Sequence, residues 1–259
     1  MSFPNKKINL SNIGRIFYGF SITGMGLQTV YYHDFPYMLI PPKHSWIPGF
    51  LMLSYISGAL LILAGVIIVL KKKTKPVALW LGVVLLLIFC FYHVPYQFIA
   101  TSNYMQPIAW DNALKELALS GGAFVIAGSF SKKNENSYRL ITFGSTLFGI
   151  TITCFGVLHF LYAKGVAEYI SSWMPCRLFW TYLAGAGLLS AGIAIILKIK
   201  VRLAASLLGT MIFIWFIILH MPKVIVSPFA EIGSEATSAL LALAYSGTAF
   251  VVAGSKKNN

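Results

Sequence analysis

Residues 113–129 read ALKELALSGGAFVIAGS, and residues 239–255, near the other end of the chain, read ALLALAYSGTAFVVAGS. Twelve of the 17 aligned positions are identical, and most of the shared residues are apolar or small. Self-similarity at a fixed spacing predicts a repeated architecture. The extent of this repeat and the secondary structure that it builds therefore determine the fold.

The repeat extends through most of the chain. Residues 19–32 match residues 149–162 at an offset of 130, and residues 45–65 match residues 172–192 at an offset of 127. The tripeptide His93-Val94-Pro95 recurs as His220-Met221-Pro222. We expect a tandem duplication in which residues 1–130 form the first unit, residues 131–139 form a cytoplasmic linker, and residues 140–259 form the second unit.

The composition predicts a membrane protein. Hydrophobic residues make up 58% of the chain and charged residues only 10%, which lies outside the range of soluble globular domains. Residues 49–70 and 178–197 are apolar runs without charge, each long enough to cross a bilayer. We expect eight spans, near residues 16–32, 49–70, 77–96, 113–130, 140–162, 177–197, 203–221 and 237–255.

These spans are expected to be helices. Backbone groups inside lipid must be hydrogen-bonded internally, so only helices and closed barrels cross a bilayer. The runs are about twice the length of a barrel strand and lack the alternation of one. The sequence therefore predicts an all-α polytopic membrane protein with eight transmembrane helices. Four spans per unit is an even number, so the two four-helix repeats are expected to be parallel.

The charges are distributed unevenly between alternate connecting segments. Fifteen of the 20 basic residues lie at the termini and in every second connection, whereas six of the seven acidic residues lie in the other connections. This asymmetry is typical of the positive-inside rule. It predicts cytoplasmic termini and a bacterial inner (cytoplasmic) membrane location, with the lipid bilayer as partner and no nucleic acid. An anionic-lipid or nucleic-acid patch is the alternative interpretation of the same lysines.

The cysteines do not predict a redox or metal site. Cys90, Cys154 and Cys176 form neither a C-x-x-C motif nor an even set. We interpret them as small apolar packing residues, and we expect no metal site. A phosphate-binding loop, a zinc signature and a nucleophile elbow are also absent from the sequence, which leaves both enzymatic and non-enzymatic classes open.

Each unit resembles the DoxX-like superfamily of four-span membrane proteins. Three features carry the resemblance: a glycine-rich first span that ends near a histidine, as in GITITCFGVLHF at 149–160, a third span that ends in His-x-Pro, and a last span of the form A-L-x-x-L-A-x-S-G-x-A-F-V-x-A-G. Two fused units of this kind would cover nearly the whole chain. In the first unit Thr29 stands where the second has His159, so any role of that histidine applies to the second unit only.

The resemblance implies several roles. Some relatives resemble subunits of thiosulfate:quinone oxidoreductases, others are linked to redox maintenance, and more distant ones act in cargo handling or assembly. Resemblance in fold does not establish function. We expect a redox-associated protein with a small apolar-ligand or quinone pocket near the outer leaflet and a soluble or membrane redox partner. The alternative is a non-enzymatic lipid-binding, transport or assembly scaffold.

Three histidines are the candidate proton-handling residues. His93 and His220 occupy the same position in the two units, each two residues before a proline near the outer end of a span, and His159 lies close to the end of its own span. Ionisable groups at membrane depth usually line a cavity or meet a partner. Three interpretations stay open: an interfacial histidine satisfied by water or lipid, a proton relay to a quinol head group, and axial ligation of haem b.

Paired tyrosines are the candidate cofactor-binding residues. Tyr55 and Tyr182 occur at equivalent positions in the second and sixth spans, where a buried hydroxyl needs a partner. Either hydroxyl could donate to a bound head group.

Lys115 and Glu116 have no charged counterpart in the second unit, where Leu241 and Ala242 occur. We interpret this pair as a solvated helix end, and a functionally specialised first unit is the alternative.

Overall fold

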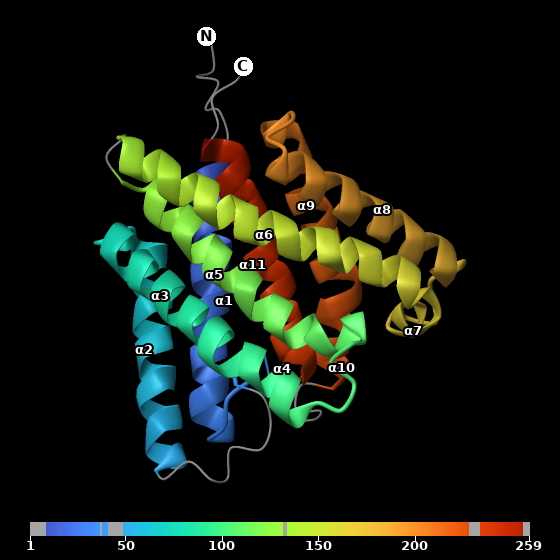
Figure 1. The fold of residues 1–259 in the computed structure, drawn as a ribbon, viewed down its shortest axis with the longest axis horizontal. Helices are drawn as coiled ribbons and strands as arrows, with labels where there is room; N and C mark the ends of the chain where they lie inside the picture. The colour runs from blue at the N-terminus through green and yellow to red at the C-terminus, as the bar shows by residue number, and fades with distance from the viewer. Residues whose placement is uncertain (1–8, 37, 41–48, 132–133, 228–233, 256–259) are drawn as a thin grey trace.

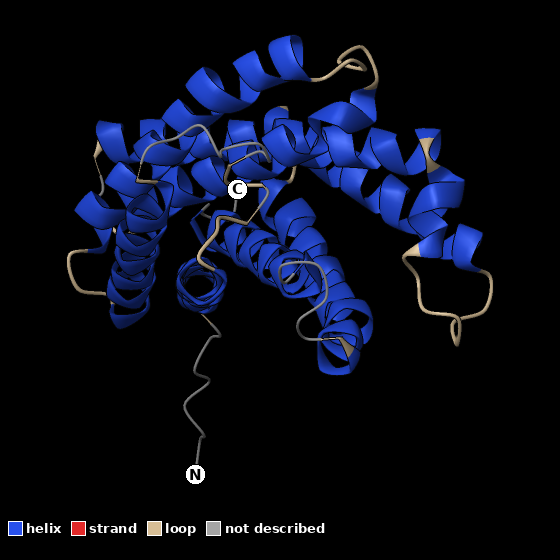
Figure 2. Cartoon of the chain, turned by 90° about the horizontal axis from the view of Figure 1, so that it is seen from below, coloured by secondary structure: helices blue, strands red, loops and turns tan. Residues whose placement is uncertain are grey.

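The computed structural model describes residues 9–36, 38–40, 49–131, 134–227 and 234–255. Helices and their connections account for all of these residues, and no strand occurs among them (Figure 2). The all-α prediction is therefore confirmed. Described residues before position 132 are called the first half below, and those after position 133 the second half.

Helices lie at all eight positions where the sequence predicted a span. The elements in chain order are α1 (Leu10–Tyr32), α2 (Phe50–Leu70), α3 (Thr74–Ile88), η1 (Phe89–His93), α4 (Val94–Ala100), η2 (Pro107–Trp110), α5 (Asp111–Ser129), α6 (Glu135–Leu161), α7 (Ala163–Glu168), α8 (Arg177–Ile196), α9 (Val201–Trp215), η3 (Phe216–His220), α10 (Met221–Val226) and α11 (Ser234–Ser255). Helices α3, η1 and α4 form one continuous helical segment, and so do α9, η3 and α10.

Six helical segments in the described part of the chain are long and apolar enough to cross a membrane: α2, α3–α4, α6, α8, α9–α10 and α11. Helices α1 and α5 fall outside this set. Helix α5 carries Asp111, Lys115 and Glu116, and α1 carries Arg15 among several small polar residues. Most of α5 is buried by other helices, so its side chains meet protein rather than lipid and do not need to be uniformly apolar.

Helices α5 and α11 lie at the centre of the bundle (Figure 1). Helix α5 packs between α3 and α6, and α11 packs between α1 and α9. Helices α2 and α8 lie outside, against α1 and α6 respectively. The first helix of each half thus packs against the last helix of the other half. This exchange of neighbours makes the two halves interdependent.

Glycines allow the two crossings between the halves to be tight. A Cβ atom on Gly121 of α5 would lie 2.7 Å from the carbonyl oxygen of Gly144 in α6. A Cβ atom on Gly247 of α11 would lie 2.6 Å from the carbonyl oxygen of Gly14 in α1. Small residues at membrane helix contacts permit such close approach of backbones. These four glycines therefore serve helix packing.

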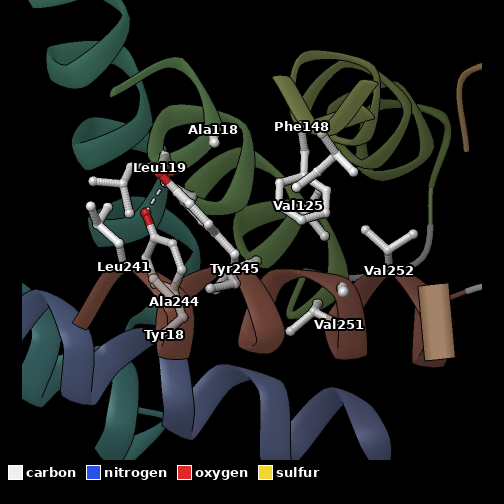
Figure 3. Packing of buried hydrophobic residues seen from close by; sticks show 14 of the residues in the cluster. Tyr18, Ala118, Leu119, Val125, Phe148, Leu241, Ala244, Tyr245, Val251 and Val252 are labelled. Carbon is white, nitrogen blue, oxygen red and sulfur yellow. Dashed lines mark hydrogen bonds between the residues drawn. The ribbon is translucent and has the colours of Figure 1, made fainter. Parts of the chain in front are cut away.

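The core is continuous across both halves and contains two buried hydroxyl contacts to α5. The Tyr18 hydroxyl of α1 donates to the Leu119 carbonyl oxygen at 2.6 Å (Figure 3). The Tyr245 hydroxyl of α11 donates to the Lys115 carbonyl oxygen at 3.2 Å. Each phenol occupies apolar volume while satisfying its own polar atom. Both bonds orient α5 between α1 and α11.

The boundary between the halves differs from the expected linker. Helix α6 begins at Glu135, inside the segment 131–139 that was expected to be a linker. The side chain of Asn134 accepts a hydrogen bond from the Ser137 N–H at 2.9 Å, which is the geometry of an N-cap. Local capping therefore extends the helix beyond its apolar run, because hydropathy alone does not register a cap.

Both ends of the described chain lie at the same end of the bundle (Figure 1). Gly254 of α11 lies directly against Ser11 of α1. At this end Arg15 donates from Nη1 to the carbonyl oxygens of Ile68 and Val69, which caps the last turn of α2. The basic α2–α3 and α8–α9 turns also lie at this end.

Candidate functional site

Each of the two long helical segments that begin with α3 and α9 contains a π-helical turn. The turns end at His93 and at His220. In the first, the Val94 N–H donates to the carbonyl of Phe89, five residues earlier. A proline follows each histidine by two residues, and the wider turn accommodates it within the helix. Isolated π turns occur frequently at functional sites because they change the direction of nearby side chains.

His93 is completely buried. Its two ring nitrogens make no hydrogen bond within the part of the chain that the structure describes. The ring lies beside the backbone of Met38 and Leu39, in the segment that follows α1. Both of those side chains are buried in the central core, so this segment folds inward over the histidine. The buried imidazole is therefore shielded from water, and the backbone of Met38 and Leu39 is the nearest polar neighbour of its ring nitrogens, although the geometry falls short of a hydrogen bond.

Two further buried polar side chains belong to the first half. Gln97 follows His93 by one helical turn, and its side-chain oxygen is buried without a hydrogen bond. Glu116 of α5 is fully buried, and neither carboxylate oxygen has a hydrogen-bond partner among the described residues. Tyr18 lies within electrostatic range of Glu116. A carboxyl without partners is expensive to bury, so its presence indicates a role beyond packing.

The interpretation of Glu116 as a solvated helix end is wrong. Helix α3 packs along α5, and the Ser120 hydroxyl of α5 donates to the Gly82 carbonyl oxygen of α3 at 2.8 Å. Glu116 lies one turn before Ser120 and is covered by the surrounding helices. Lys115 pairs with Asp111 and therefore does not neutralise Glu116. The two neighbouring charges have different environments because they lie on different faces of one helix.

The second half has no equivalent set of buried polar groups. At the positions that match Gln97 and Glu116, offset by 127 and 126, the second half has Val224 and Ala242. His220 is only partly buried and lies near Lys223. Lys223 in turn pairs with Glu235 of α11 at 3.8 Å. The fully buried polar group is thus a property of the first half alone.

His159 lies in a third environment, at the end of α6. Its Nδ1 donates to the Phe155 carbonyl oxygen at 2.7 Å, within the same helix. The carboxylate of Asp111, at the start of α5, lies within electrostatic range of the ring. His159 therefore already has a hydrogen-bond partner and a neighbouring anion, unlike His93.

The structure places Tyr55 and Tyr182 on the outside of the bundle. Their exposed fractions are 41% and 46%, so the expected burial between spans is not found. Tyr55 lies against His33 with ring centroids 5.2 Å apart, and Tyr182 stacks on Phe160 at 5.8 Å. The assignment of these tyrosines as hydrogen-bond donors to a cofactor stays a prediction.

The three predicted histidines are not brought together. Neither a hydrogen bond nor a ring contact joins His93, His159 or His220 to one another in the described residues. A search of the same residues finds no cluster of three or more histidine, cysteine or acidic side chains that could hold a metal ion.

Sequence reasoning missed Gln97 and misjudged Glu116. The signal that could have identified both was the comparison between the two units, because each is polar in one unit and apolar in the other. No protein-family model matches the chain, and no characterised protein or solved structure is significantly similar to it.

Proposed function

We propose that the chain is an eight-span inner-membrane protein built by tandem duplication of a four-helix DoxX-like unit, with both termini in the cytoplasm. The short turns support this proposal. The left-handed residues Lys71 and Lys73 between α2 and α3 recur as Lys198 and Lys200 between α8 and α9, at an offset of 127. Conformations rare for non-glycine residues thus occur at equivalent places.

Matched polar contacts support the same proposal. The bond from Ser120 to the Gly82 carbonyl has a counterpart in the bond from Ser246 to the Gly209 carbonyl, also 2.8 Å long. The π-helical turns are offset by 127 residues as well. Helices α1 and α5, which are less apolar than the other six, would complete eight spans. Helix α5 is almost entirely covered by other helices, and α1 presents Phe20, Leu27 and Tyr31 on its exposed face. The lysine-rich turns lie at the same end as both termini, as cytoplasmic termini require.

Three buried polar side chains of the first half best support a function: His93 and Gln97, one helical turn apart, and Glu116 of α5, which packs against the η1 turn that ends at His93. They are called the first-half polar site below. We infer that this site binds the head group of a quinone or a similar small, largely apolar ligand in a redox-associated process. The observation that carries this inference is the complete burial of His93 and Glu116, for which the described residues provide no hydrogen-bond partner. Ligand sites in helix bundles combine apolar walls with a few unsatisfied polar groups.

The chemistry of these groups suits a quinone. A quinone carbonyl accepts hydrogen bonds, and its reduction to a quinol takes up two electrons and two protons. The His93 imidazole can donate to a carbonyl oxygen and accept from a quinol hydroxyl. Glu116 can hold a proton in the membrane interior. The electrons would come from a soluble or membrane redox partner.

Quantification of co-purified quinone tests the site. The full-length protein is purified in mild detergent, and bound quinone per protein is measured by mass spectrometry of the extract. We expect wild type to retain quinone, and His93→Ala and Glu116→Gln to retain about tenfold less, because one lost hydrogen bond to a charged or strongly polar group costs that much. His220→Ala is the matched control and should retain quinone at the wild-type level.

Two results would contradict the quinone proposal. Wild-type protein without quinone would exclude it, and so would retention by His93→Ala equal to that of wild type. An absorption spectrum of the same samples tests haem b, the other cofactor considered. A Soret band that is lost in His93→Ala or His220→Ala would indicate that the bound cofactor is haem b and not a quinone.

A scaffold for lipid or partner binding is the second candidate. The interlocked packing favours it, because α1 and α6 each lock onto the last helix of the other half through glycine contacts. Such packing forms a rigid body rather than two halves that rock against each other. If wild type and all three variants carry only bulk phospholipid and no quinone, the scaffold is favoured.

A further inference from the structure

A groove runs between α8 and α9 in the second half. Its volume is about 540 Å³, which lies within the range of small-molecule sites, about 300–1,000 Å³. Small and apolar side chains of both helices line it, among them Gly187, Ser190 and Ala194 of α8 and Leu207 and Met211 of α9. The groove lies on the outside of the bundle, because α8 and α9 are peripheral helices (Figure 1).

The groove exists because small residues replace large ones. At an offset of 127, the first half has Leu60, Leu63 and Ile67 in α2 where the second half has Gly187, Ser190 and Ala194. The first half also has Trp80 where the second half has Leu207. At these positions the first half therefore carries bulkier side chains, and those of Leu60, Leu63 and Trp80 are exposed on the surface of the bundle, whereas the second half has an open groove.

One end of the groove is cationic. Lys200, which lines the groove, is exposed and lies immediately before α9. It forms no ion pair with any acidic residue that the structure describes. Lys198 lies in the same turn, and the first turn of α9 adds the partial positive charge of a helix N-terminus. An elongated apolar groove that ends at an unpaired cation matches a lipid with an anionic head group.

We propose that the groove between α8 and α9 is a binding site for one anionic phospholipid, with an acyl chain along the small residues of α8 and the phosphate beside Lys200. The groove opens on the outer surface of two apolar, peripheral helices, and Lys200 lies between the apolar segments of α8 and α9, at the end of the groove. The site does not involve the first-half polar site, so it does not depend on the quinone proposal.

Native mass spectrometry with defined lipids tests the site. Delipidated full-length protein in detergent is titrated with phosphatidylglycerol and, separately, with phosphatidylcholine of the same acyl chains. We expect one phosphatidylglycerol to bind about fivefold more tightly than phosphatidylcholine, as one lysine at the head group provides. Lys200→Gln should remove this preference. Lys73→Gln, the matched first-half control, should leave it unchanged.

Filling the groove tests the acyl-chain part separately. Ser190→Leu with Ala194→Ile restores the first-half residues and should weaken both lipids by at least about tenfold, since it removes the apolar contact area. Ser190→Leu alone, on an exposed position, provides the same test if the double variant does not fold. Equal binding of the two lipids to wild type, or unchanged binding by the filled variants, would overturn the proposal.

Discussion

The two halves of this protein share one helical framework and differ in what they leave unfilled. In the first half α2 carries large side chains on its outer face, and the interior holds His93, Glu116 and the side-chain oxygen of Gln97 without hydrogen-bond partners among the described residues. In the second half the interior is apolar at two of these positions, but the groove between α8 and α9 is open. The helical arrangement therefore requires neither feature, because each half adopts it without the feature of the other.

The contrast also separates structural polar residues from functional ones. Ser120 and Ser246 recur in both halves with the same hydrogen bond, so the framework accounts for them. Glu116 occurs in the first half only, and its carboxylate has no hydrogen-bond partner within the part of the chain that the structure describes. A buried polar group without a partner lowers stability, and it is retained where it contributes to function.

The glycine crossings should give the largest loss of stability, and the loss should be the same in both halves. We expect Gly121→Ala and Gly247→Ala each to lower the free energy of unfolding by about 3 kcal/mol, because the new methyl group would meet a backbone oxygen that cannot move aside. Thermal or denaturant unfolding in detergent measures the effect. Gly165→Ala is the control and should be neutral, since nothing lies within 4 Å of the added Cβ. A large effect in one half only would break the equivalence of the crossings.

Arg15 should contribute more to stability than Ser145, which occupies the matched position in the second half at an offset of 130. Its guanidinium donates to the carbonyls of Ile68 and Val69, and it lies 5.5 Å from the centre of the Phe130 ring. We expect Arg15→Ala to lower the free energy of unfolding by about 2 kcal/mol, the typical contribution of a charge-assisted hydrogen bond.

The matched control for Arg15 is Ser145→Ala. The Ser145 hydroxyl bonds only to the Thr142 carbonyl of its own helix, at 3.1 Å, so its loss should change stability little. Equal effects of the two variants, by the same unfolding measurement, would contradict a first-half cap specific to Arg15.

Replacement of Glu116 should raise the free energy of unfolding, unlike the substitutions above. Replacement by methionine, which is similar in length, removes an unsatisfied buried carboxyl, so we expect the free energy of unfolding to rise by about 1–2 kcal/mol. Bound quinone should fall in the same variant, which is the signature of a functional residue. Glu135→Met, at an exposed position of α6, should change neither quantity. A loss of stability in Glu116→Met would mean that Glu116 supports the framework.

The paired serines should give the smallest effect. We expect Ser120→Ala and Ser246→Ala each to lower the free energy of unfolding by about 0.6–1 kcal/mol, the measured range for hydrogen bonds between membrane helices. Because the two bonds are equal in length, the two losses should be equal. If the two losses of unfolding free energy differ by more than either loss itself, one half contributes more than the other to the stability of the bundle.

The helices were predictable from local properties of the sequence. The apolar runs located all eight helical segments, because the cost of placing residues in lipid depends on composition and length. Boundaries were less accurate where a cap or a π-helical turn extended a helix. Asn134 begins α6 before its apolar run, and the third predicted span continues past Pro95 to Ala100.

The candidate site was only partly predictable. His93 was identified because it recurs in both units, although recurrence does not distinguish it from the partly exposed His220. The burial of Glu116 was not predictable from its neighbours in sequence, since Lys115 and Asp111 beside it form an accessible ion pair. Tyr55 and Tyr182 were expected to be buried because they lie within spans, but their helix faces point outward.

By itself the sequence determined the all-α class, the presence of several apolar helices long enough to cross a membrane, and the similarity between the residues of its two halves. These properties follow from the composition, from the length of the apolar runs and from the spacing between similar segments. Each of these can be read from the sequence without knowing which residues meet in space. Tertiary structure alone decided that α5 and α11 are interior helices, that α1 and α6 pack across the halves, and that Glu116 is buried. The physical reason is that burial depends on neighbours distant in sequence, and the same residue is solvated or isolated according to which helix covers it.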